Sequence, residues 1–270
     1  MAITLNRRLL VLLACALPVA AALGQTGDTP AQWDEETAIR HSQAVIGEQV
    51  GDHVLTRTDG SEVRLSDYAG KPLLVSMIFT SCHHVCPMTT KRLDAAVGAA
   101  RDVLGYDSFK VVTVGFDTAN DSPQAMRSFA RAQGVNRPNW NFLSASQETV
   151  DALAEDLGFI YYPSPRGFDH ITQVSVIGRD GTVYSQVYGI QFELPWLVEP
   201  LKELVLNRPE SEGRPFAGLV DRIRLFCTVY DPSSGAYHFD YSLFIQMAIG
   251  AAAILAVVVF LVRGLRRPRA

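Results

Sequence analysis

The sequence predicts an α/β domain followed by one membrane-spanning helix. In the middle of the 270-residue chain, apolar runs alternate with segments whose apolar residues recur at helical spacing. This order is typical of a sheet with parallel strands. Near the C-terminus, residues 243–262 carry no charge, and they are about as long as a helix that crosses a bilayer. The formal net charge is −4, and the sequence has no cluster of Lys and Arg of the kind that nucleic-acid-binding proteins use.

The first elements of the domain are expected between residues 53 and 103. Two short runs in 53–65 flank Asp59-Gly60, a dipeptide typical of β-hairpins. The run "KPLLVSMIF" at 71–79 is mostly apolar and favours a buried central strand. Apolar residues then recur at helical spacing in 86–103. The sequence therefore predicts an N-terminal hairpin, a buried strand and a helix.

The later elements alternate in the same way. Serine before a helix and glycine after it are typical of helix ends, and Arg179-Asp180-Gly181 is typical of a hairpin turn. A closing antiparallel hairpin followed by a helix is the thioredoxin-like arrangement. In order, the expected elements are a buried strand (110–116), a helix with Ser122 as N-cap (122–134), a short strand (140–145), a helix (146–158), the hairpin (172–189) and a last helix containing Pro200 (194–207).

Both ends of the chain indicate export and anchoring. Arg7 and Arg8 precede an apolar run that resembles a secretory signal peptide, with an uncleaved anchor as the alternative. The arginines after the C-terminal apolar segment belong on the cytoplasmic side of a membrane. The expected organisation is a signal peptide (1–24), a leader (25–45), the thioredoxin-like domain (46–207), a linker (208–242), a transmembrane helix (243–262) and a cytoplasmic basic tail (263–270).

This order of segments predicts a location. The domain would face the bacterial periplasm while the chain is held in the inner (cytoplasmic) membrane. The periplasm is an oxidising compartment in which disulfides persist. The cysteines of the domain could therefore be used in redox chemistry.

The stretch "TSCHHVCPMTT" at residues 80–90 carries the candidate chemistry. Cys82 follows a predicted buried strand, and Cys86 opens a predicted helix, whose N-terminal N–H groups favour a thiolate. Residues four apart on a helical turn lie about 5–6 Å apart, which suits two sulfurs on one metal ion and also a disulfide. The spacing leaves a metal site and a redox pair open. It argues against His83 and His84, which would project to other faces.

A third metal ligand would have to come from elsewhere in the fold. The candidate is His170 in "RGFDHITQVSVIG", because in a thioredoxin-like fold the loop that enters the closing hairpin passes beside the cysteine helix. Two thiolates and one imidazole form a soft set that suits copper, above all Cu(I). Zinc usually takes a fourth ligand.

Three segments together resemble the SCO/SenC family of copper-binding proteins: "FTSCHHVCP", "FDTANDSP" and "FDHITQVSVIG". The resemblance covers residues from about 46 to 206. It implies a thioredoxin-like fold and copper bound by Cys82, Cys86 and His170. It also implies a role in assembling the dinuclear copper centre of cytochrome c oxidase, with the copper-bearing subunit of the oxidase as partner and a copper donor chaperone upstream.

The chain departs from the family pattern at two places. His83 stands where many members have proline, and it adds a spare ligand. The C-terminal span contrasts with the N-terminal anchor of many members. Asp117 and Asp121 match acidic positions of the family. Asp121 is expected to cap the helix at Pro123, with a role in orienting a ligand as the alternative, and the role of Asp117 stays open.

Three functions compete at this stage. The first is a membrane-anchored copper chaperone. The second is a periplasmic thiol–disulfide oxidoreductase, in which Cys82 and Cys86 form the redox pair that reduces the oxidase copper site or other exported proteins. The third is a thiol peroxidase, which would not need His170. Met88 and Cys227 are interpreted as a packing residue and an unpaired thiol.

Overall fold

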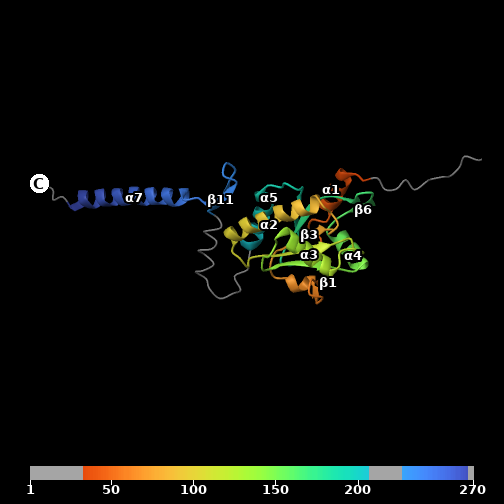
Figure 1. The fold of residues 1–270 in the computed structure, drawn as a ribbon. Coiled ribbons are helices and arrows are strands. Elements are labelled where there is room, and N and C mark those ends of the chain that lie inside the picture. The colour runs from red at the N-terminus through yellow and green to blue at the C-terminus, as the bar shows by residue number, and fades with distance from the viewer. Residues whose placement is uncertain (1–32, 207–226, 267–270) are drawn as a thin grey trace, which may run out of the picture. The chain divides into compact units, whose positions relative to one another are not determined.

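The computed structural model describes residues 33–206 and 227–266 of the chain. The predicted signal peptide, the first part of the leader, the first part of the linker and the end of the basic tail lie outside these residues. Among the described residues, the chain forms a seven-stranded sheet in the order β2-β1-β5-β4-β3-β8-β9 (Figure 1). The central strands β3, β4 and β5 run parallel, and the strands on either side pair antiparallel.

The elements of the domain follow the predicted order. The strands of the sheet are β1 (Val54–Arg57), β2 (Glu62–Arg64), β3 (Leu73–Ile78), β4 (Lys110–Gly115), β5 (Trp140–Ser144), β8 (Gln173–Ile177) and β9 (Val183–Tyr188). The helices are α1 (Glu35–Ala44), α2 (Val85–Leu104), α3 (Pro123–Gln133), α4 (Gln147–Asp156) and α5 (Leu194–Leu206), with a short 3-10 turn η1 (Leu65–Tyr68).

The core forms where the sheet meets its helices. Every residue of β3 is buried, as expected for a central strand covered on both faces. Helix α2 buries a stripe that includes Leu93, Ala96, Val97 and Ala100, and it packs against α5. This packing holds the first turn of α2, which carries Cys86, close to the segment after β3 that carries Cys82.

The helix ends follow the sequence signals. Ser122 accepts a hydrogen bond from the backbone N–H of Ala125, and Ser146 accepts one from Thr149, so each caps its helix as predicted. The expectation that Asp121 caps α3 is wrong. Its carboxylate instead accepts hydrogen bonds from Thr80, which lies after β3. The Asp121 side chain, which the local sequence suggested as a helix cap, is therefore used in a contact with a residue distant in the sequence.

Two features of the domain were not predicted. A second hairpin, β6 (Tyr161–Ser164) with β7 (Gly167–His170), stands outside the main sheet. His170 is therefore the last residue of a strand and does not lie in a loop. The leader also contributes to the packing, because Ser42 of α1 is buried and donates a hydrogen bond to Gln173 of β8 at 2.8 Å.

The C-terminal part holds a hairpin and a long helix. Strands β10 (Thr228–Asp231) and β11 (Ala236–Phe239) pair around the predicted turn, so the end of the predicted linker is structured. Helix α7 runs from Ser242 to Arg266. Its stretch Ser242–Arg263 is long and apolar enough to cross a membrane, in agreement with the predicted span.

Candidate metal and redox site

The cysteine pair lies where β3 gives way to α2. The backbone N–H of Cys82 donates to the carbonyl of Phe79 at 3.2 Å, which turns the chain sharply after the strand. Helix α2 begins at Val85, so Cys86 occupies its first turn. The backbone N–H of Cys86 then donates to Sγ of Cys82 at 3.3 Å. The Cys82 sulfur thus satisfies one of the N–H groups that a helix start leaves unpaired.

The two thiols differ strongly in acidity. The pKa of Cys82 falls to about 5, first because the Cys86 thiol donates a hydrogen bond to its sulfur, and further because backbone N–H groups of α2 point at it. The pKa of Cys86 is raised, first by the same hydrogen bond and then by burial. Around neutral pH the pair therefore holds one thiolate, at Cys82, and one thiol, at Cys86.

This asymmetry predicts the pH dependence of alkylation in the reduced, metal-free chain. Iodoacetamide reacts with the thiolate, so the Cys82 rate is expected to hold its plateau down to about pH 6 and to halve near pH 5. In the urea-unfolded chain the midpoint should move to about 8.5. Cys86→Ala removes the donating thiol and should raise the midpoint. Peptide mass spectrometry reports each cysteine separately, and a native midpoint near 8.5 would contradict the assignment.

His170 is placed by a hydrogen bond and a set of rings. Its Nδ1 lies 2.8 Å from the carbonyl of Ile171, so Nδ1 carries the proton and Nε2 keeps its lone pair for a ligand. The rings of Phe79, Phe116 and Phe159 lie 5.4–5.9 Å from the imidazole, centroid to centroid. Burial lowers the pKa of His170, which favours the neutral form that binds metals.

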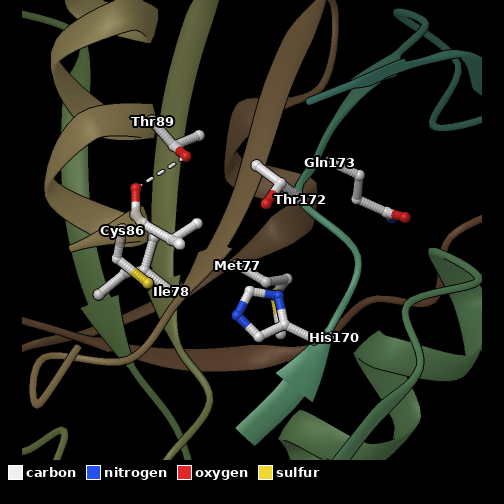
Figure 2. A pocket seen from close by; sticks show the side chains of 8 residues that line it. Met77, Ile78, Cys86, Thr89, His170, Thr172 and Gln173 are labelled. Atoms are coloured by element: carbon white, nitrogen blue, oxygen red, sulfur yellow. Dashed lines mark hydrogen bonds between the residues drawn. The ribbon is translucent and has the colours of Figure 1, made fainter. Parts of the chain in front are cut away.

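One small pocket joins α2 to the entrance of β8. Cys86 and His170 both line it, together with Met77, Ile78, Val85, Thr89, Thr172 and Gln173. Figure 2 shows the Cys86 side chain and the His170 ring reaching into this space from the two sides, with Met77 beside the ring. Cys82 contacts Cys86 but is not among the lining residues.

The predicted ligand set is therefore brought into one region. In the described part of the chain, no three His, Cys, Asp or Glu side chains are already grouped closely enough to hold a metal ion. The set Cys82, Cys86 and His170 remains a prediction, and its chemistry fits copper. It offers one preformed thiolate, one thiol that can lose its proton to a metal, and one imidazole nitrogen with a free lone pair.

The other candidate residues are placed differently. His83, His84 and Met88 are exposed around the start of α2. Cys227 is a buried free thiol at the start of the C-terminal hairpin. What sequence reasoning missed is the β6–β7 hairpin with its aromatic rings, although "SPRG" between aromatic residues at 161–168 is a recognisable turn signal.

Comparison with known proteins identifies the family. The SCO1/SenC family model matches residues 42–204, well over half of the chain. The SCO1 protein homolog of Bacillus subtilis is 27% identical over 138 residues, which is 49% of this chain and 70% of that protein. The mitochondrial SCO1 homolog of Homo sapiens is 25% identical over 137 residues, 48% of this chain but only 44% of the human protein.

Solved structures share the fold. BsSco, described as a member of the Sco family of cytochrome c oxidase assembly proteins, superposes with a TM-score of 0.53 at 21% identity, covering 59% of this chain and 94% of that one. Yeast Sco1 with copper bound gives 0.51 at 16% identity, covering 60% and 91%. These structures show a shared fold, and the match of the family model over residues 42–204 shows that the chain belongs to the SCO1/SenC family.

Proposed function

We propose that this protein is a membrane-anchored copper chaperone that assists assembly of the dinuclear copper centre of cytochrome c oxidase. The observation that carries the proposal is the convergence of Cys86 and His170 on one pocket with Cys82 hydrogen-bonded beside Cys86. Copper is the cargo of this protein. A yeast relative of the same fold has been solved with copper bound.

The ligand chemistry supports copper in particular. Cys82 is the thiolate of the pair, and Cys86 would give up its proton when the metal arrives, because a metal-bound thiol is deprotonated. His170 would add Nε2, since the carbonyl of Ile171 occupies Nδ1–H. Two sulfurs and one nitrogen form a soft set that holds Cu(I). A reduced pair is required, because a disulfide offers no thiolate.

The anchor supports action at a membrane. Helix α7 could span the bilayer, and the arginines that follow residue 262 favour a cytoplasmic C-terminus by the positive-inside rule. The site would then face the periplasm and the oxidase. A membrane-impermeant maleimide that labels Cys82 in intact spheroplasts supports this orientation, whereas labelling only after lysis contradicts it.

Loss of the protein tests the function directly. A strain that lacks this chain is expected to assemble oxidase without its dinuclear copper centre, seen as loss of the copper absorption and of oxidase activity in membranes. The wild-type gene should restore both, and Cys82→Ser with Cys86→Ser should not. Restoration by added copper alone indicates delivery. Normal copper content in the deletion strain would refute the proposal.

The acidity difference between the cysteines favours a second candidate, a thiol–disulfide oxidoreductase. The Cys82 thiolate would attack a client disulfide, forming a mixed disulfide and releasing one client thiolate. Cys86, after losing its proton, would attack the Cys82 sulfur and release the second client sulfur. The client gains two electrons and takes up two protons, and the protein is left with a Cys82–Cys86 disulfide. Rescue of the deletion strain by a small thiol reductant, but not by copper, would favour this function.

A further inference from the structure

A buried carboxylate lies at the base of the cysteine turn without a role in the ligand set. Asp121 is only 2% exposed, although aspartate is rarely buried without a partner. Among the described residues, no Lys or Arg forms an ion pair with it. The carboxylate must therefore be stabilised by hydrogen bonds, because an unsatisfied buried charge is strongly unfavourable.

Three donors converge on this carboxylate. The backbone N–H of Thr80 donates to Oδ1 at 2.7 Å, and the Thr80 hydroxyl donates to the same oxygen at 2.6 Å. The backbone N–H of Asp117 donates to Oδ2 at 2.9 Å. Hydrogen bonds to an ionised acceptor are shorter and stronger than neutral ones. Asp121 thus ties the segment after β3 to the segment after β4.

The tie is made two residues before Cys82. Thr80 stands next to Phe79, whose carbonyl accepts the Cys82 N–H, so holding Thr80 also holds the turn that presents the Cys82 sulfur. Phe79 in turn packs against the rings of Phe116 and His170. Any shift of the backbone at Thr80 would therefore move Cys82 relative to both other candidate ligands.

The space that the Asp121 side chain occupies is available only because residue 115 is a glycine and has no side chain. A Cβ added at Gly115 would lie 2.5 Å from Cβ of Asp121 and 2.8 Å from Sδ of Met126. These separations are far below contact distance. Glycine at the end of β4 is thus what allows Asp121 to sit beneath the turn.

We propose that Asp121 is a positioning residue for the cysteine pair of the copper site: its buried carboxylate fixes the backbone at Thr80 and so sets where Cys82 meets Cys86 and His170. The copper part of this inference rests on the proposed function. The positioning of the two sulfurs does not, because it bears equally on disulfide formation between them.

The variants separate positioning from general stability. In Asp121→Asn, the amide NH2 group faces one of the three donors and cannot accept its hydrogen bond. Thr80→Val removes the hydroxyl donor, whereas Thr80→Ser keeps it. Ser122→Ala is the matched control, because it removes the side-chain N-cap of the neighbouring helix α3 and so lowers thermal stability, without removing any hydrogen bond to Thr80. All variants are made in the full chain, purified in detergent micelles, and their thermal stability is recorded.

Two readouts are measured on each protein. The first is Cu(I) affinity, by anaerobic competition with a chromophoric Cu(I) chelator. The second is the fraction of Cys82–Cys86 disulfide at equilibrium with reduced and oxidised glutathione, which requires no copper. Asp121→Asn is expected to weaken Cu(I) binding by about tenfold, the size of effect found for residues that orient a metal ligand. It should also disfavour the disulfide, because the sulfurs are no longer held together.

The outcomes are distinct. The proposal is supported when Thr80→Val shifts both readouts in the same direction, Thr80→Ser behaves as wild type, and Ser122→Ala loses thermal stability with both readouts unchanged. It is overturned when Asp121→Asn matches wild type in both, or when the losses of all variants, Ser122→Ala included, simply follow thermal stability. If the wild-type chain binds no Cu(I), the proposed function fails, and the glutathione equilibrium alone decides the role of Asp121.

Discussion

Replacing His170 with alanine is expected to weaken Cu(I) binding by the full chain about a hundredfold. Loss of a residue that only hydrogen-bonds to a metal ligand already lowers metal affinity by about 10- to 100-fold, so loss of a ligand should reach at least the upper end of this range. The reason is geometric, because the side chain lies on the same pocket as Cys86 and its free Nε2 is the nitrogen available there. The fold should survive, because His170 is only partly buried. Chelator competition on the purified protein measures the change.

The controls for this result are the two histidines inside the motif. His83 and His84 are both exposed, so His83→Ala and His84→Ala should bind Cu(I) within about twofold of wild type. His83 also tests the spare ligand suggested by the sequence. Tight binding by His170→Ala together with a large loss in His83→Ala would reassign the third ligand to the motif itself.

Replacing Phe116 with alanine is expected to have the largest effect on stability near the site. The side chain is 1% exposed, and its ring lies 4.9–5.4 Å from those of Phe79, Phe159, Tyr161, Phe168 and His170, centroid to centroid. Loss of a buried phenylalanine costs about 3–5 kcal/mol of unfolding free energy. Because the same ring supports His170, Cu(I) affinity should also fall, by about tenfold.

Phe129 provides the matched comparison. It is also buried, but its ring packs on Phe142 and not on any of the candidate copper ligands. Phe129→Ala should therefore lower the free energy of unfolding by a similar amount, measured by chemical denaturation, while Cu(I) affinity of the folded protein stays near wild type. Equal losses of affinity in both variants would mean that Phe116 acts only through global stability.

Much of the domain could be predicted because its signals are local. The all-buried β3 appears in the sequence as a continuous apolar run, and α2 appears as apolar residues at helical spacing. Ser122 and Ser146 mark helix starts with side chains that bond three residues ahead. Such signals depend on neighbours in the chain, so they can be read without knowing the fold.

The β6–β7 hairpin escaped prediction for a physical reason. Its strands contain Pro163, lie outside the main sheet and are only partly buried, so they lack the alternation that marks a half-buried strand. The aromatic rings that pack against it belong to Phe79, which follows β3, and Phe116, which follows β4. His170 could be placed near the cysteines from the thioredoxin-like fold and the family resemblance, but its position at the end of a strand and its hydrogen bond to the Ile171 carbonyl are seen only in the folded structure.

For Asp121, the local sequence and the tertiary structure indicate different roles. Its place just before a helix is a good local signal for a cap, yet its partner Thr80 lies 41 positions away in the sequence. What the sequence by itself determined is the α/β order, the cysteine turn at a helix start and the apolar C-terminal helix, because each rests on local periodicity and composition. Only the tertiary structure decided that Asp121 accepts hydrogen bonds from Thr80 beside the cysteine turn and that His170 lines one pocket with Cys86, because both arrangements bring together residues that are far apart in the sequence.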